Sequence, residues 1–172
     1  RTESVLIASA GSSIPTLGGS GLAYDISKQF VHHVYPTPAG LVPFTFSDQF
    51  KEVTTRLSGN AVDATLSNDL NSFTEALLFT HRGLSGPSSL QLSNYWDVGQ
   101  RFNINFLPYL DLHVLFKTKK LSHAKSLLRT LLIEHLPKSV VLELQALIWA
   151  DVAETALGNI SDEKLEQIAS RL

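Results

Sequence analysis

The stretch Val62-Asp63-Ala64-Thr65-Leu66-Ser67 alternates apolar and polar side chains along its whole length. Successive side chains of a strand point to opposite faces of a sheet, so this period of two is typical of a half-buried antiparallel strand. The same alternation recurs in residues 101–106, where the apolar positions are Phe102, Ile104 and Phe106. The two stretches predict two strands that each turn one face toward a core.

Three neighbouring segments are further candidate strands, namely Leu41–Phe46, Thr54–Leu57 and Phe73–Thr80. Pro43 lacks a backbone N–H, which assigns the first segment to a sheet edge or a bulge. The dipeptide Gly59-Asn60 predicts a tight hairpin turn between Thr54–Leu57 and the Val62 strand. We therefore expect a small antiparallel β-barrel or curled sheet across residues 36–107.

After Pro108 the apolar residues recur at helical spacing instead, in four successive segments. These residues are Leu112, Leu115 and Phe116; Leu127, Leu128, Leu131 and Leu132; Val140, Val141, Leu144, Leu147 and Ile148; and Leu165, Ile168, Ala169 and Leu172. Pro137 and Gly158-Asn159 separate the segments, and Ser161 has the position of an N-cap. Residues 108–172 predict a helical bundle, and the chain as a whole an α+β fold.

The first 35 residues follow a different plan. Val5–Gly11 is a short apolar run, as expected of a strand buried on both faces of a parallel sheet. A glycine-rich loop follows to Gly21, and the spacing of Leu22, Ala23, Ile26 and Phe30 predicts a helix. One strand cannot form a sheet, and the chain begins at Arg1 without any methionine. We therefore expect it to be part of a longer protein.

Composition excludes several classes of function. The 172 residues carry a net charge of −2 and no cysteine, so neither a strongly basic surface nor thiolate chemistry is expected. None of the six histidines forms a metal-binding pair with a carboxylate, and no metal site is predicted. Apolar runs are too short to span a membrane and no secretory leader opens the chain, which favours a cytoplasmic protein without a membrane partner.

The nonapeptide Phe79–Pro87 concentrates the groups that could carry chemistry. It places His81 and Arg82 beside hydroxyls and two glycines, between an apolar strand and a helix start. Glycines permit close backbone approach, and an arginine can hold a phosphate or carboxylate through two hydrogen bonds. The alternative is an ordinary turn in which these side chains satisfy backbone carbonyls.

A second candidate is a basic cluster around the turn between two predicted helices, consisting of Lys117, Lys119, Lys120, His123, Lys125 and Arg129. A solvated helix face is its default interpretation. As an alternative function, the chain would be a binding module that docks RNA or a protein through this turn.

Several of these motifs resemble those of YhiN/BaiN-type flavoproteins. The resemblance rests on Leu6–Pro15 followed by Gly18 and Gly21, on Phe79–Pro87, on Gln91-x-Ser93-x-Tyr95-Trp96 and on Leu107-Pro108, and it extends over essentially the whole chain. It implies that residues 1–35 are a remnant of a two-dinucleotide-binding FAD domain. The insert of that family would then comprise the β-barrel of residues 36–107 and the helical bundle of residues 108–172.

The resemblance also implies a function for the longer protein. It would be an FAD-dependent oxidoreductase that reduces carbon–carbon double bonds or oxidises small amines, acting on a small molecule or RNA, with NAD(P)H as an electron donor. Ala8, Ser9, Ala10 and Gly11 would lie near FAD, although Ser9 and Ala10 depart from the family motif. This chain would cap the substrate and be inactive without the flavin domain of the same protein. Its pocket residues would be Thr80, His81, Arg82, Gly83, Ser85 and Gly86, with His81 and Arg82 the catalytic candidates.

Overall fold

The computed structural model describes residues 3–9 and 11–172. The chain divides into two compact units, Arg1–Pro38 and Ala39–Leu172. The second unit combines helices with one antiparallel sheet, which confirms the α+β class. The predicted boundary between residues 107 and 108 runs within this second unit, and the division into three domains stays a prediction.

In the first unit, the apolar run near the start of the chain is not a strand. Residues 3–9 lack regular secondary structure, and Val5 and Leu6 are 68% and 90% exposed. A strand needs neighbours to pair its backbone groups, and every strand of the described residues lies in the second unit. These residues are therefore not a strand within the described residues, and a buried strand that pairs with strands outside this sequence stays a prediction. The predicted helix is present as α1 (Leu22–Gln29), after a 3-10 turn at Pro15–Leu17.

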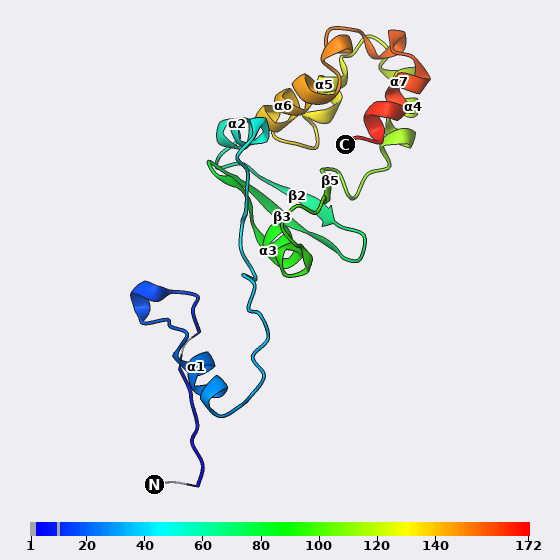
Figure 1. Ribbon diagram of the computed structural model, residues 1–172. Helices are drawn as coiled ribbons and strands as arrows, with labels where there is room; N and C mark the ends of the chain where they lie inside the picture. The colour runs from blue at the N-terminus through cyan, green and yellow to red at the C-terminus, as the bar shows by residue number, and fades with distance from the viewer. Residues whose placement is uncertain (1–2, 10) are drawn as a thin grey trace. The chain divides into compact units, whose positions relative to one another are not determined.

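The sheet of the second unit has the strand order β1-β4-β3-β2-β5, and Figure 1 labels β2, β3 and β5. Its strands are β1 (Phe44–Thr45), β2 (Ala61–Ser67), β3 (Ser72–Thr80), β4 (Gly83–Ser85) and β5 (Asn103–Asn105). β2 and β3 form a hairpin with a register from Ala61↔Leu78 to Ser67↔Ser72. Val62, Ala64 and Leu66 are buried and their neighbours are not, which confirms the period of two.

Aromatic side chains bring the two edges of this sheet together. Phe44 of β1 stacks on Phe102, which directly precedes β5, with ring centroids 4.5 Å apart. Trp96 meets the same Phe44 ring edge-on at 5.2 Å. The sheet is thereby curled into a half-barrel, and β1 lies at its edge as Pro43 predicted. Helix α3 (Pro87–Leu92), extended by a 3-10 turn at Ser93–Tyr95, packs against β2 and β3.

The predicted strand at Thr54–Leu57 is wrong, because this segment ends a helix. Helix α2 (Gln49–Arg56) begins at Asp48, whose carboxylate accepts a hydrogen bond of 3.0 Å from Phe50 N. Val53 and Leu57, four residues apart, are both buried, as on one face of a helix. Gly59-Asn60 consequently joins a helix to β2 and is not a hairpin turn between two strands.

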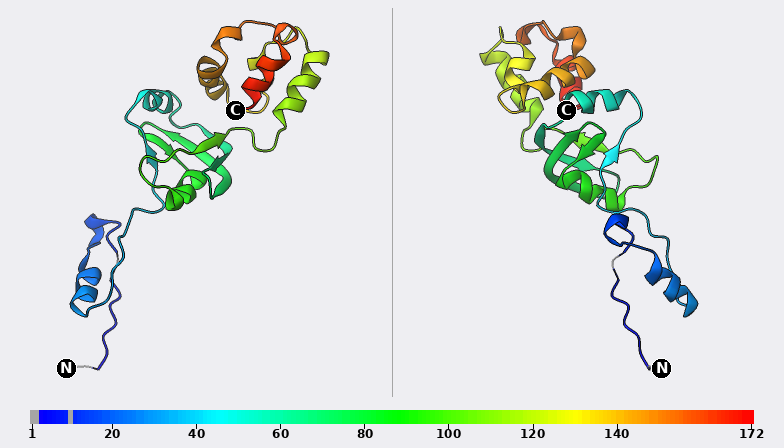
Figure 2. Two further views of the ribbon diagram at one scale, coloured as in Figure 1. Left: turned by 45° about the vertical axis from the view of Figure 1, so that its right-hand side comes forward. Right: turned by 90° about the vertical axis from the view of Figure 1, so that its left-hand side faces the viewer.

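The predicted bundle is present as α4 (Leu112–Ser122), α5 (Leu128–Leu132), α6 (Lys138–Ile148) and α7 (Asp162–Ala169), with 3-10 turns at Ala150–Val152 and Leu157–Asn159. Ser161 caps α7 as predicted, and its hydroxyl accepts a hydrogen bond from Lys164 N. Trp149 is fully buried in the core of this layer. These helices gather on the side of the sheet away from α3 (Figure 1, Figure 2). Among the described residues, no helix is long and apolar enough to cross a membrane.

Candidate functional site

The most distinctive local feature is the hairpin tip, which we define as Thr80–Gly83 between β3 and β4. Thr80 Oγ1 accepts hydrogen bonds from the backbone N–H groups of Arg82 (3.3 Å) and Gly83 (3.1 Å), and donates to Gly83 O (3.0 Å). One hydroxyl thus closes the turn. The sequence located this tip but missed β4, because a strand of three residues shows no alternation.

The two glycines of the motif are explained by packing within the sheet. A Cβ on Gly83, where φ is +151°, would lie 2.1 Å from the carbonyl oxygen of Phe44. A Cβ on Gly86, where φ is +91°, would lie 2.5 Å from the carbonyl oxygen of Ala76. The two glycines therefore permit a close backbone approach, as predicted. The groups that approach them are carbonyls of neighbouring strands and not a ligand.

The side chains of His81 and Arg82 are exposed at the tip, while their backbone is held from two sides. The carbonyl of His81 accepts a hydrogen bond of 3.1 Å from Thr55 Oγ1 of α2, and that of Arg82 accepts one of 3.1 Å from Phe46 N. Within the described residues, neither side chain has a hydrogen bond or an ion pair. The simple-turn alternative, in which these side chains satisfy carbonyls, is therefore not what the geometry shows, and both remain available to a ligand.

Sequence reasoning missed Thr55 and Phe46 as supports of the tip. Both lie more than twenty positions from it in the chain, and the strand predicted at Thr54–Leu57 would have placed Thr55 differently. Ser85, another predicted pocket residue, is half-buried in β4 opposite Leu78.

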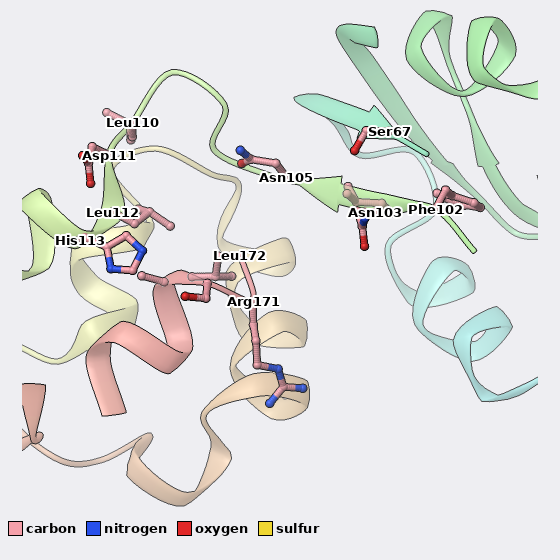
Figure 3. A pocket seen from close by; sticks show the side chains of 13 residues that line it. Ser67, Phe102, Asn103, Asn105, Leu110, Asp111, Leu112, His113, Arg171 and Leu172 are labelled. Carbon is pink, nitrogen blue, oxygen red and sulfur yellow. The ribbon is translucent and has the colours of Figure 1, made fainter. Parts of the chain in front are cut away.

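A cavity of about 670 Å³ in the second unit does not include the hairpin tip. It lies between β5, the start of α4 and the residues after α7 (Figure 3). Two of its polar side chains serve the backbone, because Asn105 accepts from Leu107 N and Asp111 accepts from Val114 N. A second cavity of about 430 Å³ lies beside the first residues of β2.

The residues predicted to lie near FAD belong to the first unit. Ala8, Ser9 and Gly11 are exposed, and Ala10 lies outside the described residues. The small or absent side chains of Ala8, Ser9 and Gly11 are compatible with a flat ring system packed against them, and the assignment stays a prediction. A Cβ on Gly19 would lie 2.7 Å from the carbonyl oxygen of Gly11, so the glycine-rich loop folds closely onto this segment.

Most charges of the basic cluster are already compensated. Lys120 Nζ lies 2.6 Å from Asp162 Oδ1, Lys119 Nζ lies 3.9 Å from Glu134, and Arg129 makes a two-bond pair with Glu154. The hydrogen bond from Lys120 lowers the pKa of Asp162, and that from Arg129 lowers the pKa of Glu154. Only a small part of the predicted positive surface is left. In the described part of the chain, no three histidine or carboxylate side chains are grouped as metal ligands.

Comparison with known proteins identifies the family. The model of the HI0933-like protein barrel and H2TH domain matches residues 38–172. The chain belongs to this family. It is 41% identical over 170 residues to a ribosomal RNA dihydrouridine synthase of Escherichia coli (strain K12), an alignment that covers 98% of this chain and 40% of the relative. A protein of the same name from Haemophilus influenzae is 35% identical over 172 residues, covering 98% and 41%.

The HI0933-like family is a flavoprotein family, so the family-level part of the predicted resemblance is confirmed. This HI0933-like chain spans about 40% of the length of the curated relatives it matches.

Proposed function

We propose that this HI0933-like chain is the substrate-covering part of an FAD-dependent oxidoreductase that reduces a uridine of ribosomal RNA to dihydrouridine. The observation that carries the proposal is the identity of 41% and 35%, over 98% of this chain, to two proteins named ribosomal RNA dihydrouridine synthase. Between the two reactions expected from the sequence, this name favours reduction of a carbon–carbon double bond over oxidation of a small amine. An enzyme acting on bacterial ribosomal RNA works in the cytoplasm, and NAD(P)H is the expected electron donor.

The chemistry defines what this part of the protein must do. When bound, reduced FAD would supply a hydride for C6 of uracil, while a proton is added at C5 and the C5=C6 double bond is lost. Because that double bond is conjugated with the C4 carbonyl, negative charge develops on O4. A fixed hydrogen-bond donor near that oxygen stabilises the transition state. None of these 172 residues is a cysteine, so a thiol donor of the C5 proton does not come from this chain.

Arg82 and His81 are our candidates for contact with the substrate. The tip that carries them is closed by Thr80 and bound to α2 through Thr55, so their backbone is fixed before substrate arrives. The guanidinium has no competing partner among the described residues. Arg82 would donate to O4 or to a phosphate of the RNA, and His81 would orient the base beside it. Thr80, Gly83, Ser85 and Gly86 would form the wall behind them, and Ala8, Ser9, Ala10 and Gly11 would lie against the flavin.

The test compares Arg82→Ala with Arg101→Ala in the full-length protein. Arg101 is also exposed and has no partner among the described residues, so it is a matched control. With unmodified ribosomal RNA as substrate, we expect Arg82→Ala to lower the rate of dihydrouridine formation by about a hundredfold, the cost of losing one transition-state donor. Arg101→Ala should retain the rate. Equal rates in both variants would remove Arg82 from the site.

The alternative function, docking of RNA or protein through the basic cluster, gains no support from the ion pairs. Lys119, Lys120 and Arg129 already face carboxylates, and the charge of Lys117 also acts on Asp162, which leaves Lys125 as its uncompensated lysine within the described residues. We therefore place the substrate at the half-barrel and not at this turn.

A further inference from the structure

The cavity of about 430 Å³ lies where the sheet meets the helical layer. Three segments line it, the start of β2 (residues 61–63), the connection after β5 (residues 106–110) and the turn before α6 (residues 135–137). Its apolar lining includes Val62, Phe106, Leu107 and Leu136, whose side chains are at most 8% exposed. The floor is thus made of core residues that have little freedom to move.

Two polar contacts join α6 to α2 and to the residue that precedes β2. The Arg56 guanidinium donates two hydrogen bonds, of 2.6 and 2.8 Å, to the carboxylate of Glu143 in α6. Ser139 Oγ donates to Asn60 Oδ1 at 2.9 Å. Because these contacts join α6 to α2 and to the start of β2, the cavity is preformed.

Three polar residues that line this cavity have side chains without a partner among the described residues. They are Asp63, Tyr109 and His135, and all three are exposed, Tyr109 by 74%. An apolar pocket with a few polar groups at its margin is typical of a ligand site. Lys138, next to the lining residue Pro137, is exposed and equally without a partner. The margin therefore offers a hydrogen-bond acceptor in Asp63, an aromatic ring in Tyr109 and a cation in Lys138.

The cavity and the hairpin tip lie at the same end of the β2–β3 ladder. Ala61, which lines the cavity, pairs with Leu78, and Asn60 O accepts from Phe79 N at 3.0 Å. Thr80 follows directly. A single extended nucleic-acid strand could therefore contact both the hairpin tip and the cavity.

We propose that this cavity binds one unpaired nucleobase that carries an exocyclic amino group, from the same RNA whose uridine meets the tip. The proposal rests on the proposed function. Single-stranded RNA is recognised by stacking of splayed bases on aromatic rings and by hydrogen bonds to their edges, which Tyr109 and Asp63 supply. A carboxylate accepts from an exocyclic amine such as cytosine N4, a group that uracil lacks. Lys138 compensates a backbone phosphate. The volume lies at the lower end of the range of about 300–1,000 Å³ for ligand pockets, which suits one nucleoside and not a folded helix.

The test measures binding of short single-stranded RNA to the full-length protein by fluorescence anisotropy. The probes are an all-uridine strand of about eight nucleotides and the same strand with one cytidine at each position in turn. We expect one cytidine register to bind about tenfold more tightly than the all-uridine strand, the lower range for a good base-edge contact. Asp63→Ala should abolish this difference, and Tyr109→Ala should weaken all strands. Asp69→Ala, an exposed carboxylate without a partner in the turn at the far end of the ladder, is the control that keeps the preference.

The outcomes separate this proposal from the proposed function. Should the unmodified protein bind and reduce RNA while Asp63→Ala and Tyr109→Ala behave like Asp69→Ala, the cavity is not a base site and the proposed function stands. Absence of RNA binding by the unmodified protein would overturn both. Since Tyr109 is mostly exposed, its variant remains informative even if Asp63→Ala were to fold poorly.

Discussion

The hydroxyl of Thr55 lies 3.1 Å from the backbone carbonyl of His81 and so ties helix α2 to the hairpin tip across the edge of the sheet. The single proton of this hydroxyl is shared with the carbonyl of Lys51, one turn earlier in α2 and 2.7 Å away. A short helix that the sequence did not predict therefore sets the position of the two residues that we assign to substrate.

Replacing Thr55 with valine should loosen the tip without changing its shape. The variant removes the hydroxyl but keeps the volume, and a net hydrogen bond of this kind contributes about 0.5–1.5 kcal/mol. We expect a lower kcat/KM for RNA in the full-length protein, by about threefold to tenfold by the same estimate. Thr55→Ser restores the hydroxyl and should recover the activity. A serine variant as impaired as the valine variant would contradict the positioning role.

Gly83 should tolerate no side chain. An alanine there would meet the Phe44 carbonyl oxygen at 2.1 Å in a backbone conformation with φ of +151°. We expect a loss in the free energy of unfolding of at least about 2–3 kcal/mol, from overpacking and backbone strain together.

Gly59→Ala is the comparison for that variant. Gly59 also has a positive φ, +90°, but no atom lies within 4 Å of an added Cβ. Backbone strain alone should lower the free energy of unfolding of Gly59→Ala by about 1 kcal/mol. Denaturant unfolding of both variants measures the difference, and equal losses would mean that β1 and β4 are not as closely packed as described.

The Arg56–Glu143 pair should give the fold a pH dependence. Hydrogen bonding from Arg56 holds the pKa of Glu143 below its ordinary value of 4.5. A carboxyl whose pKa is lower in the folded state stabilises the fold above its unfolded pKa, and this stabilisation is lost as the pH falls through the folded pKa. Glu143→Gln should therefore have a lower free energy of unfolding than the unmodified protein at neutral pH. This difference should disappear below pH 4.5, the ordinary pKa of the carboxyl.

Glu52→Gln is the matched control for this pH series. Glu52 also faces Arg56, but at 3.9 Å and with a largely exposed side chain. Exposed pairs of this kind contribute about 0–1 kcal/mol. Unfolding followed across the acid range should show little dependence on Glu52. If the difference in free energy of unfolding between Glu143→Gln and the unmodified protein stayed constant with pH, the charge of Glu143 would not be its cause.

The sequence predicts the parts of this fold in which local pattern and long-range packing agree. Alternation located β2 and β5, and capping by Ser161 located α7. It failed at Thr54–Leu57, where β-branched residues favoured a strand while the Asp48 cap and the burial of Val53 and Leu57 produce a helix. The apolar run at Val5–Gly11 stays a prediction, since such a run becomes a strand only where neighbouring strands pair with it, and the described residues of the first unit contain no strand.

The candidate site shows the same division. The tip residues are contiguous, so the motif at Phe79–Pro87 predicted where to look. Thr55 approaches from a segment 26 positions away, and no local pattern indicates such a contact. Asp63, Tyr109 and His135 come from three separate segments and meet only once the sheet and the helical layer have packed together.

Anaerobic reoxidation of the reduced, full-length flavoprotein by ribosomal RNA tests the central claim most directly. The protein is reduced until its flavin is colourless, mixed with unmodified ribosomal RNA, and followed by flavin absorbance while dihydrouridine is quantified in the RNA. The account predicts that the flavin absorbance returns and that one dihydrouridine forms for each flavin reoxidised. RNA in which the target uridine is already reduced should leave the flavin reduced. Reoxidation by a small imine with none by ribosomal RNA would contradict the account.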